Sequence, residues 1–492
     1  MNNSMCIASV ESMRDDFYHV LQLETSDPDN FFNPGTSFSR SRLLSREDIV
    51  SIPFRMEKES VSSTLGILFG DSLPSLSASA LTQARSKVRS TLYETTFNRL
   101  NEMHSHMDKD CFKGHRLIAV DGSEIKSCLT QDNAITLGGS KKGGKRSYYH
   151  LNASYDVLNH VFTDAVIQPG SVKNEDRALL EMAQRNPDPD TIYICDRGYE
   201  CLMTFHRLNA MGKNFVIRIK DEDSAISLLK HYPTPEAEEY DIPFKVTLTC
   251  KNNKQTKEHW DTYKYISSYK YLEEFSDGTA YIPLSVRVVC FKACSTNGQE
   301  SVITVCTNLP DSQFSTDDIK EIYRLRWQIE VNFRNLKRVL DLEWLHGRKQ
   351  ELVLSEIYAK MTLCNLAGRI KKLVERSDQF QRQARKRIRK RSNRKSANRK
   401  SGSDKNQETP ADANRGSSAD PYKADWSFII LQTRHWLLGK MTSQTFWGWI
   451  VNKVQIVRPG RADRRKASKR TKNNPVIIES ILEACLPETK IS

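Results

Sequence analysis

The chain has 492 residues, with 74 Lys and Arg against 60 Asp and Glu, a formal net charge of +14 and a pI near 9.1. This length accommodates about two to four domains. Its basic character favours a polyanionic partner, most commonly nucleic acid. No apolar run approaches the roughly 18 residues of a membrane span, and the N-terminus shows no secretory leader pattern, so we expect a cytoplasmic protein without a membrane partner. The eleven cysteines lack any CxxC pair, which argues against disulfide-rich and structural-zinc proteins.

The N-terminal quarter divides into two predicted segments. Residues 1–55 are rich in turn formers, as in "TSDPDNFFNPGTSFSRS", and are predicted to be irregular. Residues 56–115 have a helical pattern, in which "LSASALTQARSKVRSTLYETTFNRL" carries polar and basic side chains on one side. We interpret this segment as a helical DNA-binding domain of the helix-turn-helix kind, with the quoted stretch, residues 76–100, as its recognition helix and an ordinary amphipathic helix as the alternative.

The central part of the chain changes from strands to helices. Residues 116–220 contain apolar runs, "RLIAVDG", "TIYICDRGYE" and "FVIRIK" among them, with one helix between, which predicts a mixed α/β sheet. Residues 221–305 alternate at period two and predict an all-β insertion. Residues 306–377 contain a long helix that begins with a capping box at Ser315 and Asp318, and a second helix near 350–376.

The C-terminal part of the chain is basic in two places. Residues 378–424 contain "QRQARKRIRKRSNRKSANRK", with eleven basic and no acidic residues, followed by a low-complexity stretch. We predict a flexible linker with a basic arm that contacts nucleic acid, the alternatives being a solvated segment or a targeting patch. Residues 425–492 hold four of the seven Trp and a second basic run, "RADRRKASKR". We predict that these aromatics form a core or a subunit interface rather than base-stacking platforms.

One acidic residue stands among many basic ones in "EIYRLRWQIEVNFRNLK", residues 321–337. A helix turns about 100° per residue, so Tyr323, Arg326 and Lys337 lie within about 40° of Glu330. The apolar residues of the same stretch occupy a neighbouring arc, which is the natural buried face. The spacing therefore predicts one narrow polar stripe beside a buried face.

Two further carboxylates follow apolar strands. Asp121 precedes Gly122, and Asp196 precedes Arg197 and Gly198. A carboxylate at the end of a buried strand is costly unless it is paired or binds a metal. Together with Glu330 the two aspartates predict an oxygen-rich Mg²⁺ site. Two such ions about 4 Å apart would stabilise the attacking and leaving oxygens of a displacement at phosphorus.

The basic residues around this site are predicted to hold DNA phosphates, Arg326 by bidentate bonding and Lys337 as a point charge, beside Tyr323. We add Arg334 and Arg197 to the predicted DNA-binding set. Each feature also has a simpler interpretation. A strand-end Asp is usually a turn former, and Glu330 with Arg326 or Arg334 forms a possible surface ion pair on a helix.

The spacing Tyr-x₂-Arg-x₃-Glu-x₆-Lys resembles the signature of DDE-type insertion-sequence transposases of the "insertion sequence four" group. "RLIAVDGSEIK" resembles the first-aspartate segment of this family, "YICDRGYE" the second, and "SLSASALTQARSK" its N-terminal DNA-binding region. The resemblance covers roughly residues 60–375. The basic linker and the C-terminal tail fall outside it.

The resemblance implies an RNase H-like catalytic core with a β-rich insertion, in which Asp121, Asp196 and Glu330 bind two Mg²⁺ ions, or Mn²⁺ in their place. It implies cut-and-paste transposition, in which the enzyme hydrolyses the phosphodiester at each transposon end and joins the 3′-hydroxyl to target DNA. The implied partners are terminal inverted repeats, target DNA and a second copy in a homodimeric synaptic complex, within a bacterial or archaeal nucleoid. Some members use an aromatic residue of the insertion to hold a flipped base, and Trp260 is the one Trp there.

Two alternatives stay open. One is a nuclease of the same fold that cuts without strand transfer. The other is a transposase-derived protein that binds DNA without catalysis. The three carboxylates argue against the second alternative, because acids that face a phosphate without a metal repel it.

Overall fold

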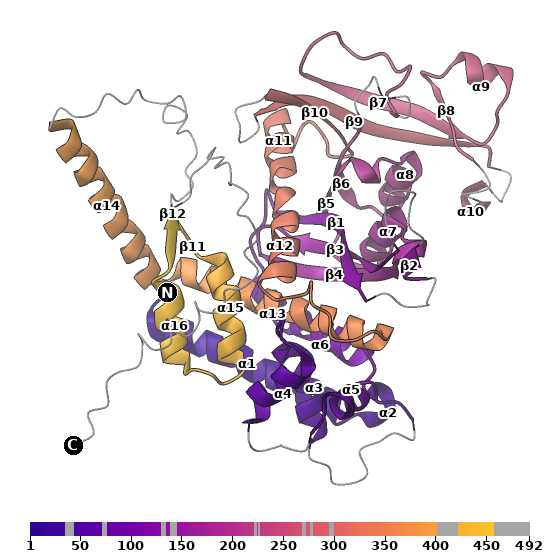
Figure 1. The fold of residues 1–492 in the computed structure, drawn as a ribbon. Coiled ribbons are helices and arrows are strands. Elements are labelled where there is room, and N and C mark those ends of the chain that lie inside the picture. Colours follow the sequence, from indigo (N-terminus) through magenta and orange to yellow (C-terminus); the bar gives the residue numbers. More distant parts are fainter. Residues whose placement is uncertain are drawn as a thin grey trace, which may run out of the picture.

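The computed structural model describes residues 1–34, 44–70, 76–128, 134–137, 145–220, 224, 227–267, 272–275, 279–294, 300–400 and 422–456 (Figure 1). The fold is mixed α/β, with one large sheet covered by helices on both faces and a group of helices below it. No helix in these ranges is long and apolar enough to cross a membrane.

A sheet of ten strands organises the molecule. Its strands are β1 (Arg116–Ser127), β2 (Thr136–Leu137), β3 (Arg146–Asp156), β4 (Val161–Pro169), β5 (Thr191–Cys195), β6 (Asn214–Arg218), β7 (Tyr240–Thr249), β8 (Tyr263–Tyr265), β9 (Tyr281–Cys294) and β10 (Glu300–Thr307). They follow the order β2–β3–β1–β5–β6–β10–β9–β7–β8, and β4 also pairs with β3. The strands β1, β5 and β6 are parallel neighbours at the centre.

Alternate residues of β1 belong to two separate cores. Leu117 and Ala119 belong to the core on what we call the front face, which also contains residues of α11 (Thr316–Leu325), α12 (Trp327–Arg338) and α13 (Gln350–Arg376). Ile118 and Val120 pack on the rear face, against α7 (Glu175–Arg185) and α8 (Leu202–Ala210). This is the period-two alternation of a strand that is buried on both sides.

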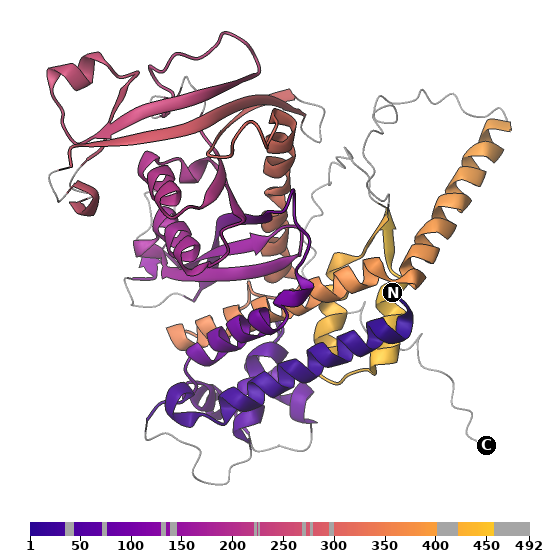
Figure 2. The same ribbon diagram turned by 180° about the vertical axis from the view of Figure 1, so that it is seen from behind.

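Further helices gather around α13 at one end of the sheet (Figure 2). Their bounds are α1 (Asn3–Thr25), α2 (Pro28–Phe31), α3 (Arg46–Arg55), α4 (Val61–Phe69), α5 (Ala78–Arg85), α6 (Thr91–Met103), α15 (Trp426–Leu437) and α16 (Ser443–Val451). The helix α13 is buried on almost all sides, as expected for a helix that is packed from several directions. It lies where the sequence places a helix over 350–376.

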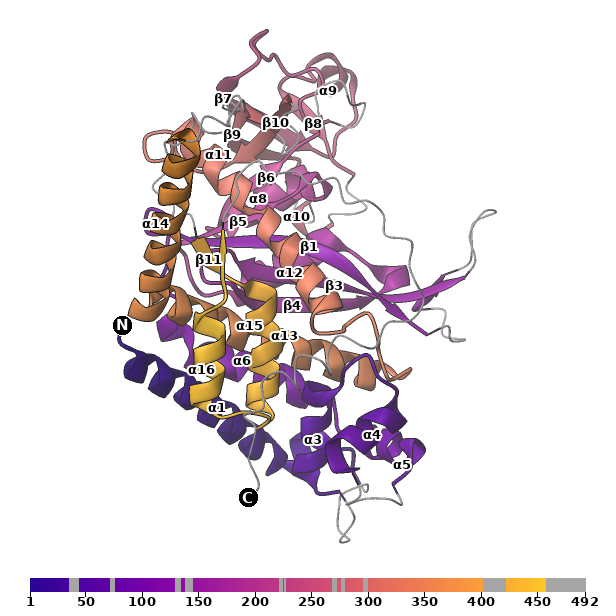
Figure 3. The same ribbon diagram turned by 60° about the vertical axis from the view of Figure 1, so that its left-hand side comes forward.

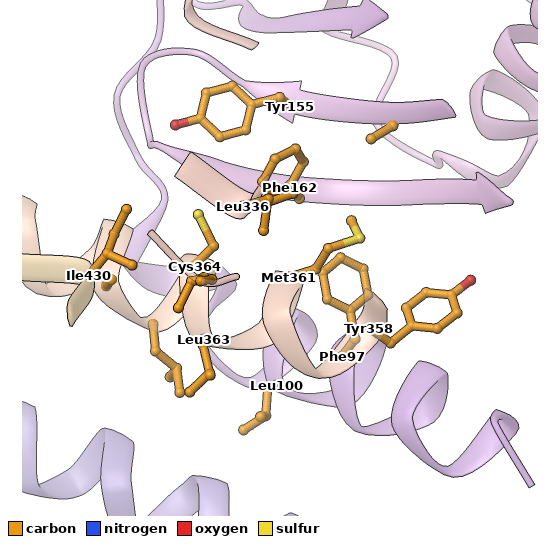
Figure 4. Packing of buried hydrophobic residues seen from close by; sticks show 14 of the residues in the cluster. Phe97, Leu100, Tyr155, Phe162, Leu336, Tyr358, Met361, Leu363, Cys364 and Ile430 are labelled. Atoms are coloured by element: carbon orange, nitrogen blue, oxygen red, sulfur yellow. The ribbon is translucent and has the colours of Figure 1, made fainter. Parts of the chain in front are cut away.

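The core at this junction joins helices that are far apart in the sequence (Figure 4). Side chains of α6, α12, α13 and α15 meet those of β3 and β4 there. The labelled members are Phe97, Leu100, Tyr155, Phe162, Leu336, Tyr358, Met361, Leu363, Cys364 and Ile430. Burial of each large apolar side chain contributes about 1.5–3 kcal/mol, so this cluster couples the helical group to the sheet.

The predicted irregular segment over residues 1–55 is wrong, because α1 fills most of its first half. The helix begins at an Asn2 cap, whose side chain accepts from the Met5 N–H at 2.9 Å. Apolar residues at helical spacing, including Val10, Met13 and Phe17, are buried against its neighbours. The turn formers that predicted irregular structure follow residue 25, after the end of this helix.

The predicted recognition helix over residues 76–100 is divided in two. Its first part is α5 and its second part is α6, separated by a turn. Arg85 in α5 is buried and forms an ion pair with Glu356 of α13 at 2.8 Å, so this arginine anchors the segment rather than facing outward. The predicted long helix after residue 315 is also divided, at Arg326, although its capping box at Ser315 and Asp318 is confirmed.

The insertion over 221–305 does not form a separate all-β unit. Its strands β7, β9 and β10 continue the main sheet from β6, because β10 pairs with β6 along Val216–Arg218. It also contains two short helices, α9 (Lys254–Glu258) and α10 (Leu272–Phe275). The all-β description was therefore wrong in this respect, since an Asn253 cap starts α9 where alternation suggested only strands.

The predicted flexible linker is wrong over its first half, where the helix α14 (Asp378–Lys400) projects from the body (Figure 3). Arg, Lys, Gln and Ala are strong helix formers, which charge counting alone overlooks. The first turns of α14 are anchored to the body, because Phe380 and Ala384 are buried there. The amino group of Met1 also lies 3.3 Å from Asp378 Oδ1, at the start of the helix. Residues 401–421 lie outside the described ranges.

The tail after residue 421 contains β11 (Tyr422–Ala424), paired with β12 (Val454–Ile456), and the helices α15 and α16. Trp436 and Trp447 are buried and Trp436 stacks on Phe446, which confirms a core role for these two aromatics. Trp449 is exposed. The basic run "RADRRKASKR" lies outside the described residues.

Candidate active site

The two predicted aspartates lie at the same level of neighbouring parallel strands. Asp196 follows β5 as predicted, but Asp121 does not end its strand, because β1 continues to Ser127. Val120 of β1 is in register with Cys195 of β5, so Asp121 and Asp196 come next on adjacent strands at the same edge. By alternation both side chains lie on the front face, toward α12. Each aspartate accepts a backbone N–H at 2.8 Å, Asp121 from Gly122 and Asp196 from Gly198.

The carboxylates of Asp196 and Glu330 lie close enough to Asp121 to change its pKa. Burial raises the pKa of Asp121 to about 6, and the nearby carboxylates of Asp196 and Glu330 add to that rise. The Gly122 N–H and the Arg326 guanidinium oppose it. The structure therefore brings the three predicted acids into one electrostatic neighbourhood.

Glu330 on α12 is engaged by its predicted neighbour. Arg326 donates from Nη2 to Glu330 Oε1 at 2.8 Å and lies over the Tyr323 ring at 5.8 Å from its centroid. This is the helix ion pair that was the simpler interpretation of the stripe. Among the described residues, no group of three or more His, Cys, Asp and Glu lies close enough together to hold a metal ion. The three acids are thus neighbours but are not gathered as ligands.

The other predicted DNA-binding residues lie around this centre at different depths. Lys337 lies near the end of α12, and its electrostatic neighbours are Glu343 and, on the later part of β1, Glu124 and Lys126. Arg334 and Arg197 are exposed. Trp260 lies in the distant insertion and is 41% exposed. Of the predicted stripe, Tyr323, Arg326 and Glu330 therefore gather at the aspartates and Lys337 does not.

Arg218 was missed by the sequence analysis. It follows Ile217 of β6, which is in register with Cys195, so Arg218 occupies the same edge as the two aspartates one strand further on. It interacts electrostatically with Tyr323, and no described residue accepts a hydrogen bond from its buried Nε. A cationic residue that ends the apolar strand "FVIRIK" was the available signal.

A pocket lies away from these residues. A pocket of about 520 Å³ opens between α6, the β3–β4 hairpin and the end of α7. Its walls include Arg116, Asp164 and Arg369, each of which faces an opposite charge. None of the predicted site residues lines it, so it is separate from the carboxylate centre.

Comparison with known proteins settles the family. The family described as Transposase DDE domain matches residues 112–366, just over half of the chain. The chain belongs to this family of DDE transposases. The matched range contains β1, β5 and α12, and with them Asp121, Asp196 and Glu330.

Relatives among curated proteins are bacterial insertion-sequence transposases. The putative transposase of insertion sequence element IS186A from Escherichia coli K12 is 24% identical over 277 residues, 51% of this chain and 65% of that protein. The transposase of IS4 from the same strain is 20% identical over 316 residues, 61% of this chain and 63% of that protein. The chain thus spans slightly less than two thirds of the length of these relatives.

Among solved structures, the chain is similar to the piggyBac transposase in a synaptic complex with hairpin DNA. The superposition covers 95% of this chain and 88% of that one at 9% identity, with a TM-score of 0.40. A likeness at this TM-score carries no argument about fold or function.

Proposed function

We propose that this chain is a DNA transposase that binds the ends of its insertion sequence, hydrolyses the phosphodiester there and joins the 3′-hydroxyl to target DNA. The observation that carries the proposal is the placement of Asp121 and Asp196 on adjacent parallel strands with Glu330 of α12 nearby, within a DDE family match. The finer assignment of the fold, an RNase H-like core with a β-rich insertion, a helical N-terminal DNA-binding domain and a C-terminal helical tail, is part of this proposal.

The three carboxylates suit a divalent cation in kind, and we propose Mg²⁺, with Mn²⁺ as a substitute. Burial, with a further contribution from the neighbouring acids, raises the pKa of Asp121 to about 6, and a cation among the acids would offset both effects. Asp121, Asp196 and Glu330 would hold the ions, which when bound stabilise the attacking and leaving oxygens of a displacement at phosphorus. Glu330 would then leave its present partner, Arg326.

The released guanidinium has a role in this scheme. Arg326 is largely buried beside Asp121, Tyr323 and Glu330, so freeing it from Glu330 would present a planar donor to a DNA phosphate. Arg218 comes from β6, and its buried Nε has no acceptor among the described residues. It supplies a second positive charge at the same edge. Both arginines position the DNA backbone, while the acids provide the reactive centre.

We propose DNA as the partner over a wider surface, and a homodimer that bridges two ends. The net charge of +14 supports a polyanionic partner. The base of α14 is anchored, and its exposed side carries Arg382, Arg385, Lys386, Arg387 and Arg389. A rooted basic helix positions charge along a duplex with less loss of conformational entropy than a flexible arm.

One observation favours a second candidate, a transposase-derived DNA-binding protein without catalysis. Glu330 is paired with Arg326, and no described acid cluster is gathered for a metal. A pure binding protein retains such a pair permanently. A nuclease that cuts without strand transfer shares all the residues above, and only its products differ.

A single assay separates these candidates. DNA flanking the gene is cloned as a donor plasmid and incubated with Mg²⁺, a naked target and either wild-type protein or Glu330→Ala. Junctions with target DNA that form only with the wild type would establish transposition and the role of Glu330. Nicks without junctions would indicate a nuclease, and tight binding of the ends without any product would indicate the non-catalytic protein.

A further inference from the structure

A histidine and a glutamate form a contact behind the proposed active site. His150 of β3 and Glu175 at the start of α7 approach with Nε2 and Oε1 2.9 Å apart. The His150 side chain is 4% exposed and that of Glu175 is 33% exposed. The pair lies on the rear face, since Gly122, next to it on β1, alternates with the front-facing Asp121. It is therefore not among the carboxylates that face α12.

The pair packs on Gly122, which follows Asp121, and Glu175 also lies near Gly198, which follows Asp196 by two residues. A Cβ atom built on Gly122 would overlap the His150 ring, at 2.8 Å from Cε1, and would lie 3.1 Å from Glu175 Oε1. A Cβ atom built on Gly198 would lie 3.6 Å from Glu175 Oε2. The Glu175 carboxylate thus lies near the middle of β1 and the end of β5, and its close approach with His150 at Gly122 requires the absence of a side chain.

These same two glycines orient the aspartates. Gly122 donates its N–H to Asp121 Oδ1 and Gly198 donates its N–H to Asp196 Oδ1, both at 2.8 Å. A peptide that is held from behind presents its N–H in a fixed direction toward the front. A path of contacts therefore runs from His150 and Glu175 through Gly122 to Asp121, and Glu175 also lies near Gly198, whose N–H binds Asp196.

We propose that His150 and Glu175, which we call the backing pair, are positioning residues that set the directions of the Asp121 and Asp196 carboxylates. This inference rests on the proposed function of the aspartates as divalent-cation ligands. Outer residues that orient ligands typically change metal affinity or activity by about 10–100-fold when they are replaced. Loss of the backing pair should act in this range without loss of the fold.

The first test measures Mn²⁺ binding to the full chain by calorimetry, without DNA. Glu175→Gln keeps the shape of the side chain but loses its charge, and it should weaken Mn²⁺ binding by about 10–100-fold. Glu181→Gln, which is exposed elsewhere on α7, is the matched control and should bind as the wild type does. Circular dichroism and end-DNA binding should be unchanged in both variants. A folded Glu175→Gln variant with wild-type Mn²⁺ affinity would overturn the proposal.

The second test uses Gly122 to separate positioning from general packing. Gly122→Ala should weaken Mn²⁺ binding, because its methyl group meets the His150 ring. In Gly122→Ala combined with His150→Ala the methyl group gains room, so the double variant should bind no more weakly than His150→Ala alone. Fully additive losses would show that the two positions act independently, which contradicts the proposed path.

Asp196→Asn is the reference variant that distinguishes failure of the backing pair from failure of the carboxylate site. If Asp196→Asn weakens Mn²⁺ binding and Glu175→Gln does not, the backing role alone fails. If Asp196→Asn itself leaves Mn²⁺ binding unchanged, the carboxylate site fails, and the backing role fails with it. Weakening by both substitutions, with cleavage by Glu175→Gln restored at high Mn²⁺ concentration, is the expected result.

Discussion

The acids on the front and rear faces of the sheet, near Asp121 of β1 and the end of β5, differ in how the fold shifts their pKa values. On the rear face the contact with His150 lowers the pKa of Glu175, so the chain itself stabilises that charge. On the front face burial and two neighbouring acids raise the pKa of Asp121 to about 6, against a single close guanidinium. Glu175 is therefore stabilised by a contact within the fold, while Asp121 is held on the front face at an energetic cost that a bound cation would offset.

The strongest way to test this contrast is to remove one front acid. Asp196→Asn keeps the side-chain volume and loses the charge, so DNA cleavage should fall by about 10³–10⁴-fold while end binding stays near the wild-type level. Single-turnover cleavage with pre-bound DNA measures this. Asp190→Asn, exposed before the other end of β5, is the control. Cleavage by Asp196→Asn at the wild-type rate would contradict the assignment.

The pH dependence of stability examines the cost on the front face. Asp121 titrates near 3.8 in the unfolded chain and near 6 in the folded protein, so between these values the folded state binds more protons. Stability should therefore fall as pH rises from about 4 to about 6 and then level off, by at most about 3 kcal/mol, a factor of about 150.

Urea unfolding in chelator from pH 4 to pH 8 measures this fall. Asp121→Asn should flatten the pH profile, and Mn²⁺ should raise wild-type stability at pH 7 more than at pH 5. An unchanged profile in Asp121→Asn would show that another group is responsible.

Replacing the basic residue Arg326 on the front face should slow cleavage less than removing an acid does. Arg326→Gln loses both the Glu330 contact and a bidentate phosphate donor, so cleavage should slow by about 10–100-fold through misplaced DNA. Arg324→Gln, two residues earlier and exposed beside Glu321, is the matched control. Equal rates for the two variants, measured in the same cleavage assay, would remove Arg326 from the site.

The smallest predicted effect lies far from both faces, on α14. Arg385→Gln removes one exposed charge, so the slope of log affinity against log salt should decrease by about 0.9. Filter binding of a random duplex between 50 and 200 mM salt measures it. Lys254→Gln on α9, 89% exposed, gives the comparison for an unrelated surface charge. An identical slope in Arg385→Gln and the wild type would show that this position makes no phosphate contact.

Local patterns in the sequence predicted the aspartates and the central strands, because an apolar run that ends in Asp-Gly or Asp-Arg-Gly is a short-range signal. Residues that act only across the sheet were not predictable in this way. His150 and Glu175 meet because β3 and α7 lie side by side, and no spacing along the chain encodes that contact. Arg218 required the register of β5 and β6.

The helices α14 and α1 were not predicted, because composition suggested irregular structure at both places. The basic run after residue 381 was interpreted from its charge, although most of its residues favour helices. The turn formers around residue 30 hid the buried periodicity of α1, in which Phe17 has 2% exposure. In both places packing against distant parts of the chain decided the outcome, as tertiary contacts often do for helices.

The buried helix α13 has a consequence for cooperativity. It binds Arg85 through Glu356 and the Phe162 backbone through Asn365, partners that are 271 and 203 positions away in the chain. Such long-range contacts make loop closure costly and folding slow. They also leave the helices before β1 no separate core of their own, so these helices and the carboxylate edge should unfold in one transition. We therefore expect heat or denaturant to unfold the N-terminal helices and the carboxylate edge together.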